Sequence, residues 1–352
     1  MCEVAVVTTG FFDGVHLGPR QVLSAVVSAA RERGEEAIVV TFWPHPRTVL
    51  QQDARDLRLL STLEEKKEML LAAGIDRVEV LPFTRSFAAL TASEYLQMLR
   101  ERFNASVIVM GYDNRIGSDS KTCRQLLGEG YSSETVGSAD PSLKGPSLLW
   151  CRGWHRFQKS THLPATGALE VAATGSGDQQ PSETALPPDS CQPGQPSCEP
   201  ERSSCYSESP VSSTQIRKAL EEGRIEDANG MLGYRYGLYG VVVAGNRMGR
   251  TIGFPTANMQ LYEPLKLVPA NGVYVVEVEV LGKKYAGMCN IGLRPTVGGS
   301  ARTVETHILD FDEDIYGLPL GIRFVRRLRD ERKFPSLDAL REQLEIDKRS
   351  IE

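Results

Sequence analysis

The sequence lacks the features that place a protein in a membrane, on nucleic acid or outside the cell. No apolar stretch approaches the roughly 20 residues that a membrane-spanning helix needs. The apolar start of the chain has no basic segment before it and no small-residue cleavage site after it. The formal net charge of −5 provides no basic excess for binding nucleic acid. We therefore expect a cytosolic protein that binds neither membranes nor nucleic acid.

Closely spaced cysteines are missing as well. Three of the seven cysteines, Cys191, Cys198 and Cys205, lie seven residues apart in a polar tract, and Cys151 lies upstream of them. Two thiolates that bind one zinc ion usually stand two to four residues apart. We interpret these residues as incidental thiols rather than as a zinc site.

The first third of the chain alternates short apolar runs rich in Val and Ile with amphipathic helical stretches. This pattern is typical of a parallel sheet covered on both faces, the doubly wound layout of nucleotide-binding domains. With 352 residues, the chain is long enough for two domains. The predicted strands are residues 4–9, 37–42, 76–81 and 105–111, and the predicted helices are 20–33, 64–73 and 92–102.

Residues 137–210 differ in character from the rest of the chain. Pro, Ser, Gly and Gln dominate this tract, and apolar periodicity disappears. Such composition predicts a disordered, low-complexity insertion. Order returns at a Ser/Thr cluster, residues 212–214, which opens a helix over 215–222.

The last third reads as strands with no helices between them. Gly- and Pro-containing turns separate these strands, which indicates an antiparallel sheet closed into a small barrel. A final amphipathic helix is predicted over residues 336–349. The predicted strands are residues 237–243, 272–281, 284–291, 303–311 and 321–328.

A glycine-rich turn ends the first predicted strand and leads directly into a helix. It comprises residues 9–19, with the sequence TGFFDGVHLGP. Glycines let a backbone come close to a phosphate chain, and the start of a helix offers unpaired N–H groups. His16 adds a side chain that can donate to a phosphoryl oxygen. The turn indicates a nucleotide site, although the same pattern also suits a tight strand-to-helix connection.

This turn resembles the G-x-F-D-G-V-H-x-G-H signature of the FMN adenylyltransferase domain in bacterial bifunctional riboflavin kinase/FAD synthetases. Three further segments, at residues 40–47, 111–117 and 212–217, agree with the family in the same order. The resemblance implies that ATP phosphates lie over His16, the catalytic residue of adenylylation, and that no covalent enzyme intermediate forms. The nucleotide-binding residues that it implies are Gly10, Phe12, Asp13, Gly14, Gly18, Asp113, Arg115, Ser213, Thr214 and Arg217.

The chain departs from the family at Pro19, where the signature has a second histidine that helps to stabilise the pentacovalent α-phosphorus. Proline suits a first helical turn but has no side-chain donor. The loss of one donor aimed at developing charge costs roughly 10²–10³ in rate. Asn114 and Ile116 also stand where His or Phe is more usual, and the insertion stands where the family has a shorter flap. Slow or lost adenylylation is an alternative that stays open.

A second glycine-rich segment, residues 245–258, resembles the G-x-x-x-G-R-x-I-G-F-P-T-A-N signature of riboflavin kinases. Such a turn supplies N–H groups for ATP phosphates, and a hydroxyl and an amide two residues apart are hard oxygen ligands for Mg²⁺. We expect Thr256 and Asn258 to bind magnesium and phosphate. The nucleotide-binding residues expected here are Gly245, Gly249, Arg250, Gly253, Thr256 and Asn258.

Residues 290–297 and 304–311 match two more kinase motifs. By that resemblance Glu305 corresponds to the general base that takes the proton from the ribityl 5′-hydroxyl of riboflavin. Strand alternation puts Glu305 on the same face as His307. The imidazole either orients the carboxylate or makes a structural hydrogen bond, and the sequence leaves both readings open.

The sequence thus predicts an α/β nucleotidyltransferase domain over residues 1–136, completed by 211–230, and a β-barrel kinase domain over 231–352. The resemblance implies that MgATP phosphorylates riboflavin to FMN and that ATP adenylylates FMN to FAD with release of pyrophosphate. A riboflavin kinase with a degenerate first domain is one alternative. A non-catalytic flavin-binding regulatory protein is another, but Glu305 argues against it, because binding alone needs no base.

Overall fold

The computed structural model describes residues 4–50, 57–111, 114–122, 125–126, 133–134, 147–150, 211–245, 248–296 and 299–351. Contacts divide the chain into two units. One consists of Met1–Arg152 and Pro210–Glu352, and the other, Gly153–Ser209, lies outside the described residues. The four cysteines discussed above and most of the predicted insertion lie outside them too.

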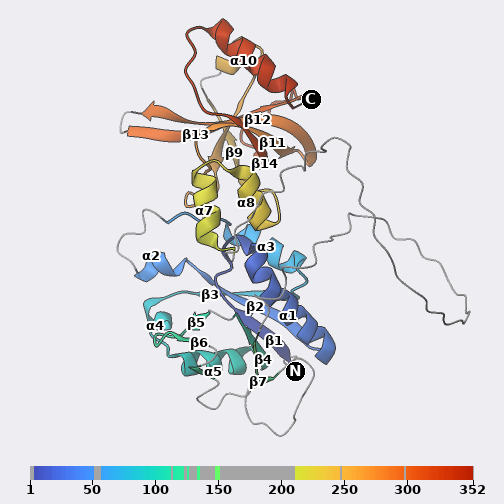
Figure 1. Cartoon of the computed structure of the whole chain (residues 1–352), viewed down its shortest axis with the longest axis vertical. Coiled ribbons are helices and arrows are strands. Elements are labelled where there is room, and N and C mark those ends of the chain that lie inside the picture. Colours follow the sequence, from blue (N-terminus) through green and yellow to red (C-terminus); the bar gives the residue numbers. More distant parts are fainter. Residues whose placement is uncertain are drawn as a thin grey trace, which may run out of the picture. The chain divides into compact units, whose positions relative to one another are not determined.

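The N-terminal part of the first unit contains a six-stranded sheet, coloured blue to green in Figure 1, in which every pairing is parallel. Its spatial order is β3-β2-β1-β4-β8-β7. The strands are β1 (Ala5–Thr9), β2 (Glu36–Trp43), β3 (Arg77–Pro82), β4 (Ala105–Met110), β7 (Ser133–Glu134) and β8 (Ser147–Trp150).

Helices cover both faces of this sheet, as the periodicity predicts. Successive strand residues point to opposite faces. Val6 of β1 packs in one buried cluster with Leu23, and Val7 packs in another with Leu96. The helices are η1 (Asp13–Val15), α1 (Leu17–Arg33), α2 (Pro46–Leu50), α3 (Leu63–Ala72), α4 (Arg85–Ala88) and α5 (Ala92–Phe103).

Strand β8 lies within the tract that the sequence assigns to the insertion. It pairs in parallel with β4, from Val107 opposite Ser147 to Met110 opposite Trp150. Its apolar sequence, SLLW, suits a strand in a sheet that is covered on both faces. Part of the predicted insertion therefore extends the sheet.

The C-terminal part is a closed antiparallel barrel, coloured orange in Figure 1, with the strand order β10-β13-β12-β11-β14-β9. The predicted fold class is therefore confirmed for both parts of the chain. The strands are β9 (Gly237–Val243), β10 (Ala257–Leu261), β11 (Gly272–Val280), β12 (Lys283–Thr296), β13 (Gly299–Ile308) and β14 (Pro319–Arg329).

Strand β10 was not among the strands predicted from the sequence, although it closes the barrel by pairing with β13 and β9. Its sequence, ANMQL, alternates apolar and polar residues over only five positions. That alternation is the signal of a half-buried strand, but it follows directly on the glycine-rich motif and is short.

Two short helices, α7 (Ser213–Glu221) and α8 (Ile225–Leu232), precede the barrel. A capping box of Ser212 and Gln215 begins α7. Leu220 and Ile225 lie in the same buried cluster as Phe324 of β14, so both helices share the barrel's core. The last helix, α10 (Leu337–Arg349), is tied to β14 by the buried Asp347, which binds Arg329 at 2.7 Å. Among the described residues, no helix has the length and apolar content to span a bilayer.

Candidate active sites

The turn between β1 and α1 has an unusual backbone that only certain residues tolerate. Gly14 has a φ of +78°, and a side chain there would start 2.9 Å from Cβ of Leu60. Phe12 also adopts a left-handed conformation, with φ at +50°. The two left-handed residues reverse the chain direction sharply, so that α1 begins only three residues after Gly14.

His16 is the N-cap of α1, and it is 7% exposed. Its Nδ1 accepts the N–H of Gly18 at 3.3 Å, which leaves the proton of the neutral ring on Nε2. Burial lowers the pKa of His16 to about 4. The imidazole is therefore a neutral hydrogen-bond donor at neutral pH. Gly18 lies close to the carbonyl of Val211, so the segment leading into α7 meets the turn here.

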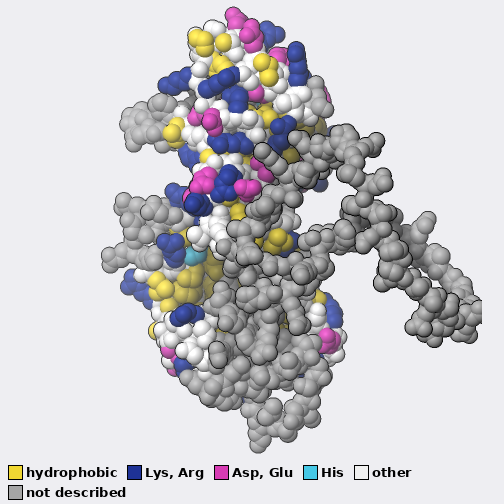
Figure 2. Space-filling model, viewed as in Figure 1, with side chains coloured by type: hydrophobic (Ala, Val, Ile, Leu, Met, Phe, Trp, Pro, Cys, Tyr) yellow, Lys and Arg dark blue, Asp and Glu magenta, His cyan; other side chains and the backbone are white. Residues whose placement is uncertain are grey.

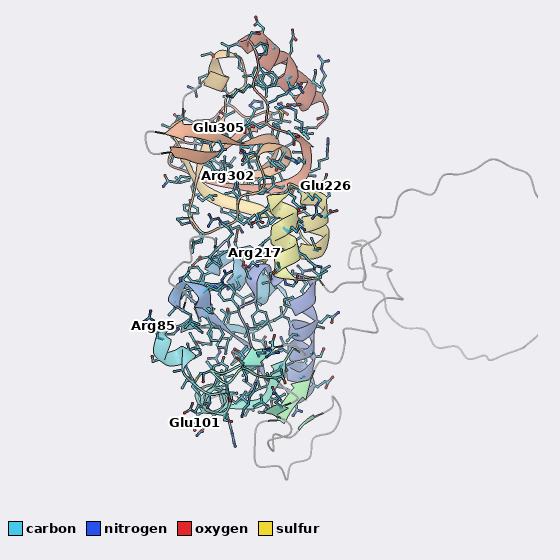
Figure 3. The ribbon with its side chains drawn as sticks, turned by 60° about the vertical axis from the view of Figure 1, so that its left-hand side comes forward. Arg85, Glu101, Arg217, Glu226, Arg302 and Glu305 are labelled. Carbon is cyan, nitrogen blue, oxygen red and sulfur yellow. The ribbon has the colours of Figure 1, made fainter. Side chains whose placement is uncertain are left out.

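Asp13 links three segments that are far apart in the sequence. Its buried carboxylate accepts the N–H groups of Leu60 and Ser61 at 3.0–3.1 Å. Arg217 of α7, labelled in Figure 3, donates from Nη2 to the same carboxylate at 2.5 Å and from Nε to the carbonyl of Arg58 at 2.8 Å. The structure thus brings Asp13, His16 and Arg217 together, and Asp13 holds Arg217 in place.

The remaining residues expected at this first site lie on separate helices, strands and loops. Ser213 and Thr214 form the first turn of α7, whereas Arg115 lies on β5 (Arg115–Ile116), which pairs with β6 (Lys121–Thr122). Gly10 directly follows β1 and lies against the ring of Phe12. Asp113 is outside the described residues.

The barrel places Glu305 between two amide side chains. Glu305 of β13, labelled in Figure 3, is opposite Asn258 of β10 and opposite Asn290 of β12. Residues directly opposite in antiparallel strands point to the same face of the sheet. Val304 and Thr306 on either side are buried, so Glu305 faces away from the barrel's interior. The register therefore brings together the expected base and the expected metal ligand.

The glycine-rich segment of the barrel folds into a tight loop around α9 (Met248–Thr251). Phe254 donates its N–H to the carbonyl of Gly249 at 2.8 Å, and a side chain at Gly249 would collide with the carbonyl of Phe254. Gly253 has a φ of +83°, and Arg250 is exposed on α9. The loop leads directly into Thr256 and β10.

His307 makes the structural hydrogen bond that was one of its two readings. Its Nδ1 donates to the carbonyl of Pro255 at 2.8 Å, and its ring lies 5.1 Å from that of Phe254. Burial lowers the pKa of His307, which favours the neutral ring. The imidazole therefore anchors the loop that carries Thr256.

Comparison with known proteins identifies the family of each part of the chain. Residues 2–138 match the model of the FAD synthetase family, and residues 232–352 match that of the riboflavin kinase family. The bifunctional riboflavin kinase/FMN adenylyltransferase of Bacillus subtilis is 30% identical over 98% of this chain and 90% of its own length. That of Listeria monocytogenes is 32% identical over 97% of this chain and 90% of its own. The chain belongs to this family. It is an ATP-dependent transferase of flavin biosynthesis, with an FMN adenylyltransferase domain and a riboflavin kinase domain.

A solved structure is similar to this chain over almost its whole length. A crystal structure from Streptococcus pneumoniae, described as a macrolide-efflux protein, superposes with a TM-score of 0.75 at 29% identity. The match covers 99% of this chain and 94% of that one.

An aromatic cavity of about 590 Å³ opens beside the turn between β1 and α1. We refer to this turn, residues 9–19, as the adenylyltransferase turn. Sequence reasoning missed most of its lining, because its aromatic residues come from separate segments that no local pattern connects. Figure 2 shows hydrophobic side chains gathered beside a histidine on the α/β part. A flat ring such as adenine or isoalloxazine fits such a lining. The aromatic residues of the cavity are Phe11, Phe42, Phe83, Phe87 and Tyr95.

The residues of the kinase site fit the magnesium ion that the family implies. A side chain at Gly245 would start 2.1 Å from Nδ2 of Asn258, so glycine leaves room for that amide. Within the described part of the chain, no group of three or more His, Cys, Asp or Glu residues could hold a metal ion. A hydroxyl and an amide suit Mg²⁺ that arrives with ATP phosphates and keeps several of its waters.

Proposed function

We propose that riboflavin is phosphorylated beside Glu305 on the barrel and that FMN is adenylylated at the turn around His16. The observation that carries the kinase assignment is the register that sets Glu305 between Asn258 and Asn290. A base, an amide ligand and the phosphate-binding loop then lie on one side of the sheet.

In the kinase reaction the ribityl 5′-oxygen attacks the γ-phosphorus of ATP, the bond from γ-phosphorus to the β,γ-bridging oxygen breaks, and ADP leaves. Glu305 takes the hydroxyl proton. Thr256 and Asn258 would hold Mg²⁺, which neutralises charge on the phosphates when it is bound. His307 keeps the loop of Thr256 in place through Pro255.

In the adenylyltransferase reaction a phosphate oxygen of FMN attacks the α-phosphorus of ATP, and pyrophosphate leaves. His16 donates from Nε2 to a phosphoryl oxygen, and Arg217, which Asp13 holds beside the turn, adds a positive charge. Two features support this assignment: the neutral, donor-competent ring of His16 and the aromatic cavity beside the turn.

A kinase without adenylylation is the second candidate, because Pro19 stands in the first turn of α1 and offers no side-chain donor. The cytosol is the proposed compartment.

A product analysis tests both assignments. Purified protein is incubated with riboflavin and MgATP, and in parallel with FMN and MgATP, and the flavins are separated by chromatography. We expect FMN and FAD in the first reaction and FAD in the second. If riboflavin is converted to FMN but no FAD forms in either reaction, the protein is a kinase only. Riboflavin that binds without turnover would support the regulatory alternative.

A further inference from the structure

Lys66 on α3 is a buried ammonium group without a hydrogen-bond partner. The residue is 0% exposed, and its Nζ has no partner among the described residues. The other deeply buried lysine, Lys266, is different: its Nζ donates to the carbonyl of Leu60 at 2.8 Å and to the carboxylate of Glu65. An unpaired charge in the protein interior costs several kcal/mol of stability. The buried charge of Lys66 therefore destabilises the folded protein, and no hydrogen bond among the described residues offsets this.

The Lys66 side chain points at the adenylyltransferase turn. Its Nζ lies 3.6 Å from the centroid of the Phe11 ring, which belongs to the signature turn. The Phe11 ring in turn stands edge-on to the ring of His45 at 4.0 Å. The attraction of a cation to an aromatic face is weaker than the cost of burying an unpaired charge, so Phe11 offsets only part of that cost. Phe11 is half-buried and lines the aromatic cavity, so the ammonium lies just behind the wall of the site.

The charges around Lys66 leave this turn with an excess of positive charge. Asp13 is the carboxylate that acts on Lys66, and it already binds Arg217. His16 and His45 are neutral at pH 7, because burial lowers the pKa of each to about 4. Two cations thus share one carboxylate. Burial also lowers the pKa of Lys66 to about 8, from an ordinary value of 10.5. A bound anion would neutralise the excess positive charge and favour the protonated form of Lys66.

We propose that Lys66 supplies the buried positive charge that binds the phosphates of ATP at the adenylyltransferase turn. Phe11 covers the ammonium in the free protein. The phosphates take over as its partner when ATP binds, and the charge that builds up on the departing pyrophosphate faces a cation in a site of low dielectric. This inference rests on the proposed adenylylation at this turn.

Lys66→Met tests the inference, because methionine has nearly the same length and shape without the charge. We expect kcat/KM for ATP in FAD formation to fall by about 10²–10³, with the melting temperature unchanged or raised, since a buried unpaired charge is gone. Kinase turnover should stay the same. Lys67→Met, one position along α3, is the matched control and should change neither activity.

A purely structural Lys66 gives a different result. If Lys66→Met lowers the melting temperature and the two activities fall together, the lysine serves the fold and the inference is overturned. A pH profile adds a readout that packing does not move. In the wild type, kcat/KM for ATP in FAD formation should fall as the pH rises past about 8, as free Lys66 loses its proton. If kcat/KM in Lys66→Met falls above about pH 8 as it does in the wild type, the assignment is overturned.

Binding of inorganic pyrophosphate separates this inference from the proposed function. Calorimetry on the whole protein should show weaker pyrophosphate binding in Lys66→Met than in the wild type and in Lys67→Met. If the wild type makes no FAD but still shows this difference, the adenylylation assignment fails and the phosphate role of Lys66 stands. Equal affinity in all three proteins overturns the role of Lys66.

Discussion

Replacing Glu305 with glutamine separates an enzyme from a flavin binder. Glutamine keeps the size and the hydrogen-bonding reach of the side chain but cannot take a proton. The register neighbours Asn258 and Asn290 carry amides, which can pair with either side chain. Because Glu305 is only partly buried and faces away from the core, we expect the free energy of unfolding to change by less than about 0.5 kcal/mol.

The expected loss of rate follows from the chemistry. A positioned general base is commonly worth about 10²–10⁴ in rate. That range corresponds to about 3–5 kcal/mol of transition-state stabilisation. Because the base acts only when the hydroxyl attacks, the loss should appear in kcat for FMN formation and leave KM for riboflavin nearly unchanged.

Initial rates of FMN formation from riboflavin and MgATP measure this effect, and fluorescence titration of riboflavin checks binding. FAD formation from supplied FMN serves as the internal control, because His16 and Arg217 belong to the other site. Asp310→Asn is the matched variant: Asp310 is exposed, two residues beyond the end of β13, and should be silent. Near-normal kinase turnover in Glu305→Gln would refute the assignment and make Asp310 the next candidate.

Three further predictions follow from particular contacts. Pro19→His should raise FAD formation from FMN without changing FMN production, because it adds an imidazole to the first turn of α1; an unchanged rate would show that another group fills the role. Gly245→Ala should lower kinase kcat/KM for MgATP, because the new Cβ would lie 2.1 Å from the Asn258 amide; wild-type kinetics would contradict this. His16 and His45 have folded pKa values of about 4, below the ordinary 6.5. Their contribution to stability is present above pH 6.5 and is lost as the pH falls toward 4; equal urea midpoints at pH 7 and pH 5 would exclude it.

Local sequence patterns determined most of the architecture. The change from alternating strands and helices to uninterrupted strands predicted a parallel sheet followed by an antiparallel barrel, because burial repeats with the period of each element. The signatures around His16 and Glu305 indicated the proposed sites from adjacent residues alone. Strand β10 escaped prediction because five alternating positions directly after a glycine-rich loop give too weak a periodic signal.

Only the tertiary structure decided which distant residues meet. Asp13 and Arg217 are 204 residues apart in the chain, and no local pattern predicts their ion pair. The position of Glu305 opposite Asn258 depends on the register between β13 and β10, which barrel closure sets. Lys66 looks like an ordinary helix lysine in the sequence, and its unpaired charge appears only when α3 packs behind the turn. Periodicity encodes which face of an element is buried, whereas pairing and charge balance depend on what that face is packed against.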